Sequence, residues 1–126
     1  MKSVMIQPFS LNGKVKIPPS KSLCHRAVMA AGLSKGECTL DNITLSEDII
    51  ATCGIMEKLG VKITKSQNKL LTNGKGKLQL INNEFQCNES GSTLRFLIPI
   101  AMLTGGKIIF KGMAHDVGCT GCRLLF

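Results

Sequence analysis

The sequence predicts one α/β domain, in which amphipathic helices alternate with short strands. Hydrophobic residues recur at helical spacing in three stretches, 20–33, 46–59 and 90–103, and runs of β-favouring residues separate them. Glycines or prolines stand at the ends of most of these segments. The 126 residues, of which 44% are hydrophobic, suit a single globular domain and exclude a disordered tail protein.

The first predicted elements are a strand, a helix and a second strand. A short β-favouring run at 15–17 ends at two prolines, and a helix then extends over 20–33 with Ser20 as its N-cap. Gly36 follows the end of this helix, as glycines often do. Alternating apolar residues and β-formers at 38–43 predict the next strand.

A second helix and two further strands complete the order βαβαββ. Ser46 is the predicted N-cap of this helix, and two acidic residues in its first turn suit the positive end of the helix dipole. Gly60 ends the helix. Strands are expected at 61–64 and 70–72, followed by a glycine-containing turn at 73–76.

The second half of the chain resumes the same alternation. After a weak strand at 78–81, the pattern starts again at Glu84, and a helix runs from Ser90 to a pair of glycines. A strand is expected at 107–111. Pro99 lies inside the helix, where a proline removes a backbone hydrogen bond, so we expect a kink or a local break there.

The composition narrows the classes of partner. The chain has 16 Lys and Arg residues against 8 Asp and Glu residues, and the net charge of +8 favours nucleic acids, membrane surfaces or anionic metabolites. Single-stranded nucleic acids are usually bound by stacking on aromatic side chains, and the chain has five Phe, no Tyr and no Trp. We therefore expect no nucleic-acid partner. Without a long apolar run or a secretory signal, we also expect a cytoplasmic protein with no membrane partner.

Residues 113–126 show no helical or strand period and are predicted to form a loop. Cys119 and Cys122 within this segment have the spacing of a zinc or redox motif. A structural zinc site needs four ligands, and the remaining candidates are scattered along the chain: His25, Cys87 and His115. We expect no metal site, and we expect the six cysteines to be reduced thiols.

One helix start combines hydroxyl and basic side chains in a way that suits an anion. Lys21 and Ser22 open the helix at 20–33, and Arg26 follows one turn later. Free backbone N–H groups, the helix dipole and both cationic side chains would converge on one phosphate or carboxylate. His25, in the same turn, is interpreted as a core residue, because no carboxylate lies near it in sequence to orient it as a general base.

A second helix start, near Ser90, carries a similar arrangement. Gly91 lets a ligand approach the backbone, and Arg95 lies four residues later on the same helix face. Spacing alone favours a plain serine-capped helix with a solvated basic residue at either start, and the presence of two such starts in one small basic chain shifts the balance somewhat toward anion binding. Neither start contains a dinucleotide or P-loop fingerprint.

Five segments resemble the start of the 3-phosphoshikimate 1-carboxyvinyltransferase family, also called the 5-enolpyruvylshikimate-3-phosphate synthases, in the family's order and spacing. The segments are Ile17-Pro18-Pro19-Ser20-Lys21-Ser22-Leu23-Cys24-His25-Arg26, Leu40-Asp41-Asn42, Ser46-Glu47-Asp48, Leu59-Gly60-Val61 and Asn88-Glu89-Ser90-Gly91-Ser92-Thr93-Leu94-Arg95. The first and last segments are specific to the family.

The resemblance implies transfer of the enolpyruvyl group of phosphoenolpyruvate to the 5-hydroxyl of shikimate 3-phosphate, with release of phosphate, in the synthesis of chorismate and the aromatic amino acids. Lys21 would contact both substrates, and Ser22 and Arg26 would bind shikimate 3-phosphate. Gly91 would lie on the phosphoenolpyruvate side, with Arg95 nearby. No cofactor is implied, and no catalytic residue is assigned within this chain.

The related UDP-N-acetylglucosamine enolpyruvyl transferases are the alternative within the same fold. Their matching segment carries a Lys-Asn pair where this chain has Lys21 and Ser22. Glu89 stands where many members of the first family have Asn, which leaves its role open. A basic nucleic-acid-binding module is the alternative from another class.

The resemblance also implies a fold of two inside-out α/β domains, each built from βαβαββ units, in proteins that are usually monomeric. We expect residues 1–126 to form a single partial domain, an incomplete α/β barrel in which 1–112 match the family and 113–126 diverge. An Arg-Pro pair that the family carries after this point is missing, as a frameshift or an early stop would explain. We therefore expect a truncated N-terminal fragment that is inactive alone.

Overall fold

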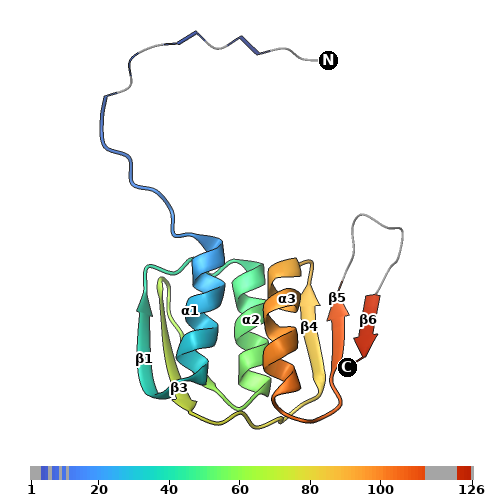
Figure 1. Ribbon diagram of the computed structural model, residues 1–126. Helices are drawn as coiled ribbons and strands as arrows, with labels where there is room; N and C mark the ends of the chain where they lie inside the picture. Colours follow the sequence, from blue (N-terminus) through green and yellow to red (C-terminus); the bar gives the residue numbers. More distant parts are fainter. Residues whose placement is uncertain (1–3, 6, 9, 11, 113–121, 126) are drawn as a thin grey trace.

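The computed structural model describes residues 4, 5, 7, 8, 10, 12–112 and 122–125, and side chains up to residue 112. Three helices lie side by side and cover one face of the strands (Figure 1). The elements in chain order are α1 (Lys21–Leu33), β1 (Lys35–Asp41), α2 (Glu47–Lys58), β2 (Lys62–Lys65), β3 (Lys69–Lys75), β4 (Glu84–Asn88), α3 (Gly91–Met102), β5 (Ile109–Gly112) and β6 (Cys122–Leu125).

The first unit is an antiparallel sheet in which β3 lies between β1 and β2. Alternate residues of β3, among them Leu70 and Thr72, point toward the helices and are buried. Gly74 lies where α1 ends, and an added Cβ there would come within 2.1 Å of the Ser34 carbonyl oxygen and 2.7 Å of the Gly32 carbonyl oxygen. The close approach of α1 to the sheet therefore requires a glycine at position 74.

The second unit places β5 between β4 and β6, parallel to β4 and antiparallel to β6. Phe85 of β4 and Phe110 of β5 are both fully buried, and their rings pack edge to face with centroids 5.3 Å apart. On the exposed side, Lys111 donates to the Glu84 carboxylate at 2.7 Å. The aromatic pair thus anchors this sheet to the helix layer.

One hydrophobic core runs between the helices and both sheets. Its fully buried members come from α1, α2, α3 and three of the strands or the residues that flank these elements: Val28, Ile49, Cys53, Ile55, Met56, Leu59, Leu70, Phe85, Leu97, Ile108 and Phe110. Side chains from both units therefore pack into one shared cluster.

The three predicted helices are confirmed, together with two of their serine caps. Ser20 accepts from the Leu23 amide at 3.5 Å, and Ser90 accepts from the Thr93 amide at 3.1 Å. Ser46 occupies the N-cap position of α2 but makes no side-chain capping bond. Of the kink or local break expected at Pro99, the break is wrong, because α3 continues through Pro99 to Met102, and the kink stays a prediction. A proline in the last turn removes only one helical hydrogen bond.

Two predicted strands are wrong, and both errors concern pairing. Residues 15–17 pair with no described strand, and Val15 and Ile17 are exposed. The segment 78–81 instead donates to the end of α2, from Gln79 to the Leu59 carbonyl at 3.0 Å and from Ile81 to the Lys58 carbonyl at 2.8 Å. These bonds satisfy carbonyls that the helix end leaves free, so the segment has no need of a sheet partner.

Two other local predictions also need correction. The expected turn at 73–76 is wrong, because β3 continues to Lys75 and stays paired with β1 there. The expected loop at 113–126 is wrong in its last part, where Cys122–Leu125 pairs with β5 as β6. Residues 113–121, which include Cys119, lie outside the described residues.

Candidate functional site: the common end of three helix N-termini

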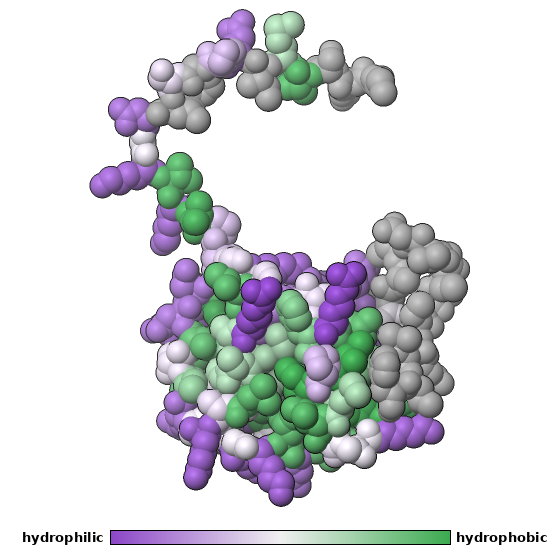
Figure 2. All heavy atoms as spheres, in the orientation of Figure 1, coloured by the Kyte–Doolittle hydropathy of each residue, from purple (hydrophilic) through white to green (hydrophobic). Residues whose placement is uncertain are grey.

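All three helices begin at the same end of the molecule, where residues 12–20 enter the fold (Figure 1). Strands β1 and β4 run toward this end, and each is followed by a short connection into α2 or α3. Figure 2 shows apolar side chains across the middle of the helix layer and elongated hydrophilic side chains over the part where the helices begin. This end therefore combines helix dipoles with charged side chains.

Lys21 links the start of α1 to the start of α2. Its ammonium group forms an ion pair with the carboxylate of Asp48, while the Lys21 side chain stays 59% exposed. An ammonium carries three N–H donors, so Lys21 can hold Asp48 and still donate to an anion in solvent. The ion pair fixes the direction of a side chain that would otherwise move freely.

Arg26 links α1 to α3. Its guanidinium carbon lies 5.4 Å from the centroid of the Phe96 ring, which is cation–π distance. Arg26 remains exposed, so its N–H donors are open to a ligand. Phe96 directly follows Arg95, so this contact joins the predicted anion site of α1 to the helix that carries Arg95.

The remaining predicted site residues, Ser22, Gly91 and Arg95, are exposed at the starts of α1 and α3. A Cβ added at Gly91 would meet no described atom within 4 Å outside its own helix and chain neighbours. Packing therefore does not demand a glycine at position 91, whereas a ligand approaching the backbone would benefit from the open space.

The three helix starts differ in their preference for charge. The first turns of α1 and α3 contain no acidic residue, whereas α2 begins with Glu47 and Asp48. Unpaired first-turn N–H groups attract anions, and acidic side chains compete with an anion for them. An anionic ligand is thus directed to α1 and α3, while α2 supplies the carboxylate that orients Lys21.

His25 is buried behind these residues and is 1% exposed, as predicted for a core histidine. Its Nδ1 lies 2.8 Å from the hydroxyl oxygen of Thr52 on α2. Burial lowers the pKa of His25; the negative charge of Asp48 opposes this shift, and the positive charge of Lys21 adds to it. The imidazole is therefore neutral at physiological pH.

We expect the free energy of unfolding to decrease as the pH falls below about 6.5, the ordinary pKa of histidine. The unfolded chain takes up a proton on His25 before the folded protein does, because the folded-state pKa is lowered, so falling pH favours unfolding. The contribution of His25 to the free energy of unfolding is complete above pH 6.5. Below that pH, the free energy of unfolding falls by at most about 1.4 kcal/mol per pH unit through this residue.

Urea denaturation at several pH values between 5 and 8 would measure this slope. A His25→Asn variant keeps a polar group near the Nδ1 position and removes the titration, so its slope should be smaller than that of the wild type. Equal slopes in the two proteins would show that His25 does not carry the effect.

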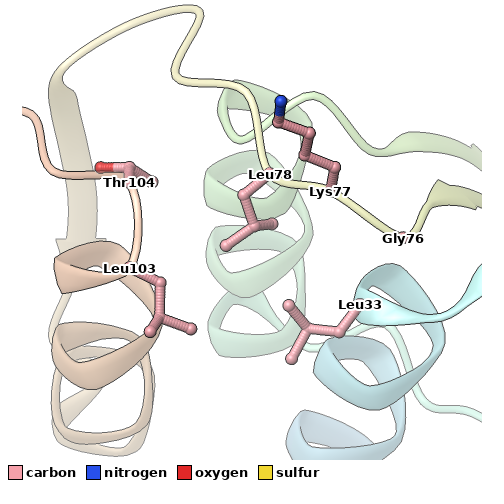
Figure 3. Close-up of a pocket in the computed structure, with 6 residues that line it drawn as sticks. All are labelled: Leu33, Gly76, Lys77, Leu78, Leu103 and Thr104. Atoms are coloured by element: carbon pink, nitrogen blue, oxygen red, sulfur yellow. The ribbon is translucent and has the colours of Figure 1, made fainter.

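A pocket at the other end of the molecule does not fit an anion. It has a volume of about 330 Å³ and is lined by Leu33, Gly76, Lys77, Leu78, Leu103 and Thr104 (Figure 3). Leu33 and Leu103 come from the C-terminal ends of α1 and α3, where the helix dipole repels negative charge. The apolar side chains that point into it in Figure 3 also offer little to a phosphate.

Two contact residues of this site were missed in the sequence. From the sequence, Asp48 is only a favourable first-turn acid and Phe96 is only part of the apolar stripe of α3, whereas the structure gives both a contact with a site residue. The spacing of Lys21 and Asp48 along the chain carries no signal of their contact, because it depends on how two helices pack. Among the described residues, no cluster of three His, Cys, Asp or Glu could hold a metal, and the described cysteines 24, 38, 53 and 87 are free thiols.

Comparison with known proteins identifies the family. The sequence model of the protein family EPSP synthase (3-phosphoshikimate 1-carboxyvinyltransferase) matches residues 6–115 of this chain. The chain belongs to the EPSP synthase family. This match covers both helix starts described above and confirms the resemblance found in the sequence.

Curated relatives of this EPSP synthase family chain carry the name 3-phosphoshikimate 1-carboxyvinyltransferase. The protein of Clostridium perfringens strain 13 is 52% identical over 116 residues, which are 91% of this chain and 27% of the relative. The protein of Clostridium kluyveri is 50% identical over 112 residues, 89% of this chain and 26% of the relative. The chain thus spans about a quarter of the length of these transferases.

The fold agrees with solved EPSP synthases. A structure of EPSP synthase from Acinetobacter baumannii superimposes with a TM-score of 0.74 at 24% sequence identity and covers 81% of this chain and 24% of that chain. The predicted α/β architecture, a part of the enolpyruvyl transferase fold, is therefore confirmed. Of the helices in the described part of the chain, none has the length and hydropathy that a bilayer crossing requires.

Proposed function

We propose that this chain binds shikimate 3-phosphate and phosphoenolpyruvate as the N-terminal substrate-binding part of a 3-phosphoshikimate 1-carboxyvinyltransferase. The observation that carries the proposal is the placement of Lys21, Arg26 and the open start of α3 at one end of the molecule, with Lys21 held by Asp48 of α2 and Arg26 against Phe96 of α3. Both substrates are strongly anionic, and this end supplies fixed cations and two helix N-termini without first-turn acids.

Each predicted site residue has a role in this proposal. Lys21, held at the start of α1 by Asp48, contacts both substrates, while Ser22 and Arg26 bind shikimate 3-phosphate. Gly91 leaves the backbone of α3 open to phosphoenolpyruvate, and Arg95 supplies a second cation on that side. The Phe96 ring lies against the Arg26 guanidinium, and this contact supports a site shared by α1 and α3.

In the proposed reaction, the 5-hydroxyl oxygen of shikimate 3-phosphate forms a bond to C2 of phosphoenolpyruvate, and the bond between C2 and the phosphate oxygen breaks. The hydroxyl proton must be removed, and the methylene carbon must be protonated and later deprotonated. Asp48 is held by Lys21, so we assign anion binding and no proton transfer to the residues of this end.

The partners of the chain are accordingly small molecules. We propose that it uses no cofactor, binds no nucleic acid and acts in the cytoplasm as a monomer. The cationic groups of the site are placed at one end by specific contacts, Lys21 with Asp48 and Arg26 with Phe96. Such an arrangement fits compact anions better than an extended polynucleotide, which needs a long basic surface with aromatic side chains.

Calorimetric titration of the 126-residue chain tests the proposal. Shikimate 3-phosphate is expected to bind at least about tenfold more tightly than shikimate, which differs only in lacking the phosphate, and added salt should weaken its binding. Equal affinity for the two compounds, or no binding of either, would refute the assignment. In a coupled assay with both substrates we expect no phosphate release above the enzyme-free control, because no described residue is assigned a proton-transfer role.

A further inference from the structure

A chain of buried polar side chains joins the three helices directly beneath the proposed anion site. Four polar residues form this chain, and each is at least 97% buried: His25 of α1, Thr52 of α2, Thr93 of α3 and Ser90, the N-cap of α3. The His25 Nδ1 lies 2.8 Å from the Thr52 hydroxyl, which lies 2.9 Å from the Thr93 hydroxyl. The Thr93 hydroxyl lies 2.7 Å from the Ser90 hydroxyl. One continuous hydrogen-bonded path therefore crosses all three helices.

This path meets the proposed site at Asp48. The Asp48 backbone carbonyl oxygen lies 3.2 Å from the Thr52 hydroxyl oxygen and 3.3 Å from the Thr93 hydroxyl oxygen, so it can accept from either of them. The carboxylate of the same residue holds the ammonium group of Lys21. Asp48 thus contacts threonines of two helices on its buried side, and its carboxylate holds Lys21 on the exposed side.

The chemistry of the path makes its members interdependent. Each hydroxyl has a single proton, so a hydroxyl that donates to one neighbour must accept from another. The Asp48 carbonyl can only accept, and the His25 Nε2 has no partner among the described residues, so the ring is held through Nδ1 alone. Removing one hydroxyl would leave buried polar neighbours unsatisfied and force the path to rearrange.

We propose that Thr93, together with Thr52 and the His25 ring that holds the Thr52 hydroxyl, is a positioning residue that sets where Asp48 holds Lys21 relative to the start of α3. The inference rests on the proposed function, because its consequence is the spacing of the groups that bind the two substrates. None of the three side chains touches a substrate, since all are buried. Substrate affinity nevertheless depends on them, because small displacements of a binding group reduce affinity strongly.

A purely structural role would have a different signature. If the threonine hydroxyls only satisfied one another within the core, their loss would lower stability and leave affinity unchanged. Thr72 is a matched control: it is fully buried in β3, and its hydroxyl donates to the Cys38 carbonyl at 3.3 Å, within the sheet. Thr72→Val removes a buried hydroxyl in the same way without touching the path beneath Lys21.

The first experiment compares affinity for shikimate 3-phosphate at a temperature where every variant is folded. Thr93→Val, which keeps the shape and removes the hydroxyl, should raise the dissociation constant by about fivefold or more. Thr93→Ser, which keeps the hydroxyl, should bind within about twofold of the wild type, and so should Thr72→Val. Wild-type affinity in Thr93→Val, or an equal loss in Thr72→Val, would overturn the proposal.

A second measurement needs no ligand and separates this inference from the proposed function. The ¹⁵N resonance of the Lys21 side-chain ammonium reports its contact with Asp48. Thr93→Val should shift this resonance and the backbone amides of residues 21–26, and Thr72→Val should not. If the wild type fails to bind but these shifts occur, the proposed function is wrong and the positioning role stands. If Thr93→Val leaves the Lys21 resonance unchanged, the positioning role is wrong whatever the ligand does.

Discussion

Replacement of Arg26 by alanine is expected to weaken the binding of shikimate 3-phosphate by at least about tenfold, and by up to about 150-fold. A charge-assisted hydrogen bond contributes about 1.5–3 kcal/mol, and Arg26 offers its donors to solvent while the Phe96 ring holds its guanidinium in place. Arg26 is exposed and takes no part in the core, so the fold should be unaffected. Isothermal titration calorimetry of the purified chain measures the change.

Two control variants separate a specific contact from a general effect of charge. Lys107→Ala removes one positive charge from an exposed position between α3 and β5, at the end opposite the helix starts, and should leave the affinity unchanged. Arg26→Lys keeps the charge but loses the planar donors, so its affinity for shikimate 3-phosphate should lie between those of the wild type and Arg26→Ala. Equal losses in Lys107→Ala and Arg26→Ala would mean that only net charge matters, and the assignment of Arg26 would fail.

Replacement of Phe85 by alanine is expected to produce the largest loss of stability, about 3–5 kcal/mol. The Phe85 ring is fully buried and packs edge to face against Phe110, with centroids 5.3 Å apart, so its removal leaves a cavity between β4, β5 and the helices. A domain of this size has a total stability of about 5–15 kcal/mol, and the variant loses a large part of it. Urea denaturation followed by circular dichroism measures the loss.

Phe85→Leu keeps the test informative if Phe85→Ala does not fold. Leucine fills part of the cavity, so this variant should fold and should be destabilised less than Phe85→Ala. Leu71→Ala is the matched surface control, since Leu71 is 41% exposed on the face of β3 that points away from the helices. Its replacement should lower the free energy of unfolding much less than Phe85→Ala does. A Phe85→Leu protein as stable as the wild type would show that the aromatic pair does not anchor the second sheet.

The positions of the helices could be predicted because their signals are local. Ser20 and Ser90 cap helices at the predicted residues, and the apolar spacing of α1, α2 and α3 marks the faces that the structure buries. A helix satisfies its backbone hydrogen bonds within a few residues, so neighbouring residues carry most of the information. The break expected at Pro99 is the exception among these local predictions. A proline near the end of a well-packed helix lowers its stability too little to break it.

The strands were predicted less well because a strand requires a partner that is distant in sequence. Residues 15–17 have the composition of a strand but no described neighbour to pair with, whereas β6 forms because β5 offers an edge. The continuation of β3 through Gly74 likewise depends on pairing with β1 and on the close approach of α1. Composition records the preference for extended backbone and cannot record the partner.

The sequence by itself determined the family and the chemical character of the site: basic residues and hydroxyls at two helix starts, in the order that the EPSP synthase family shows. Only the tertiary structure decided the contacts of these residues. Asp48 forms an ion pair with Lys21, the Phe96 ring packs against Arg26, and the Thr93 hydroxyl bonds to Thr52 between the helices. The physical reason is the separation of these pairs along the chain. Helix dipoles and caps act within one turn, whereas ion pairs and buried hydroxyl contacts form only after packing brings distant helices together.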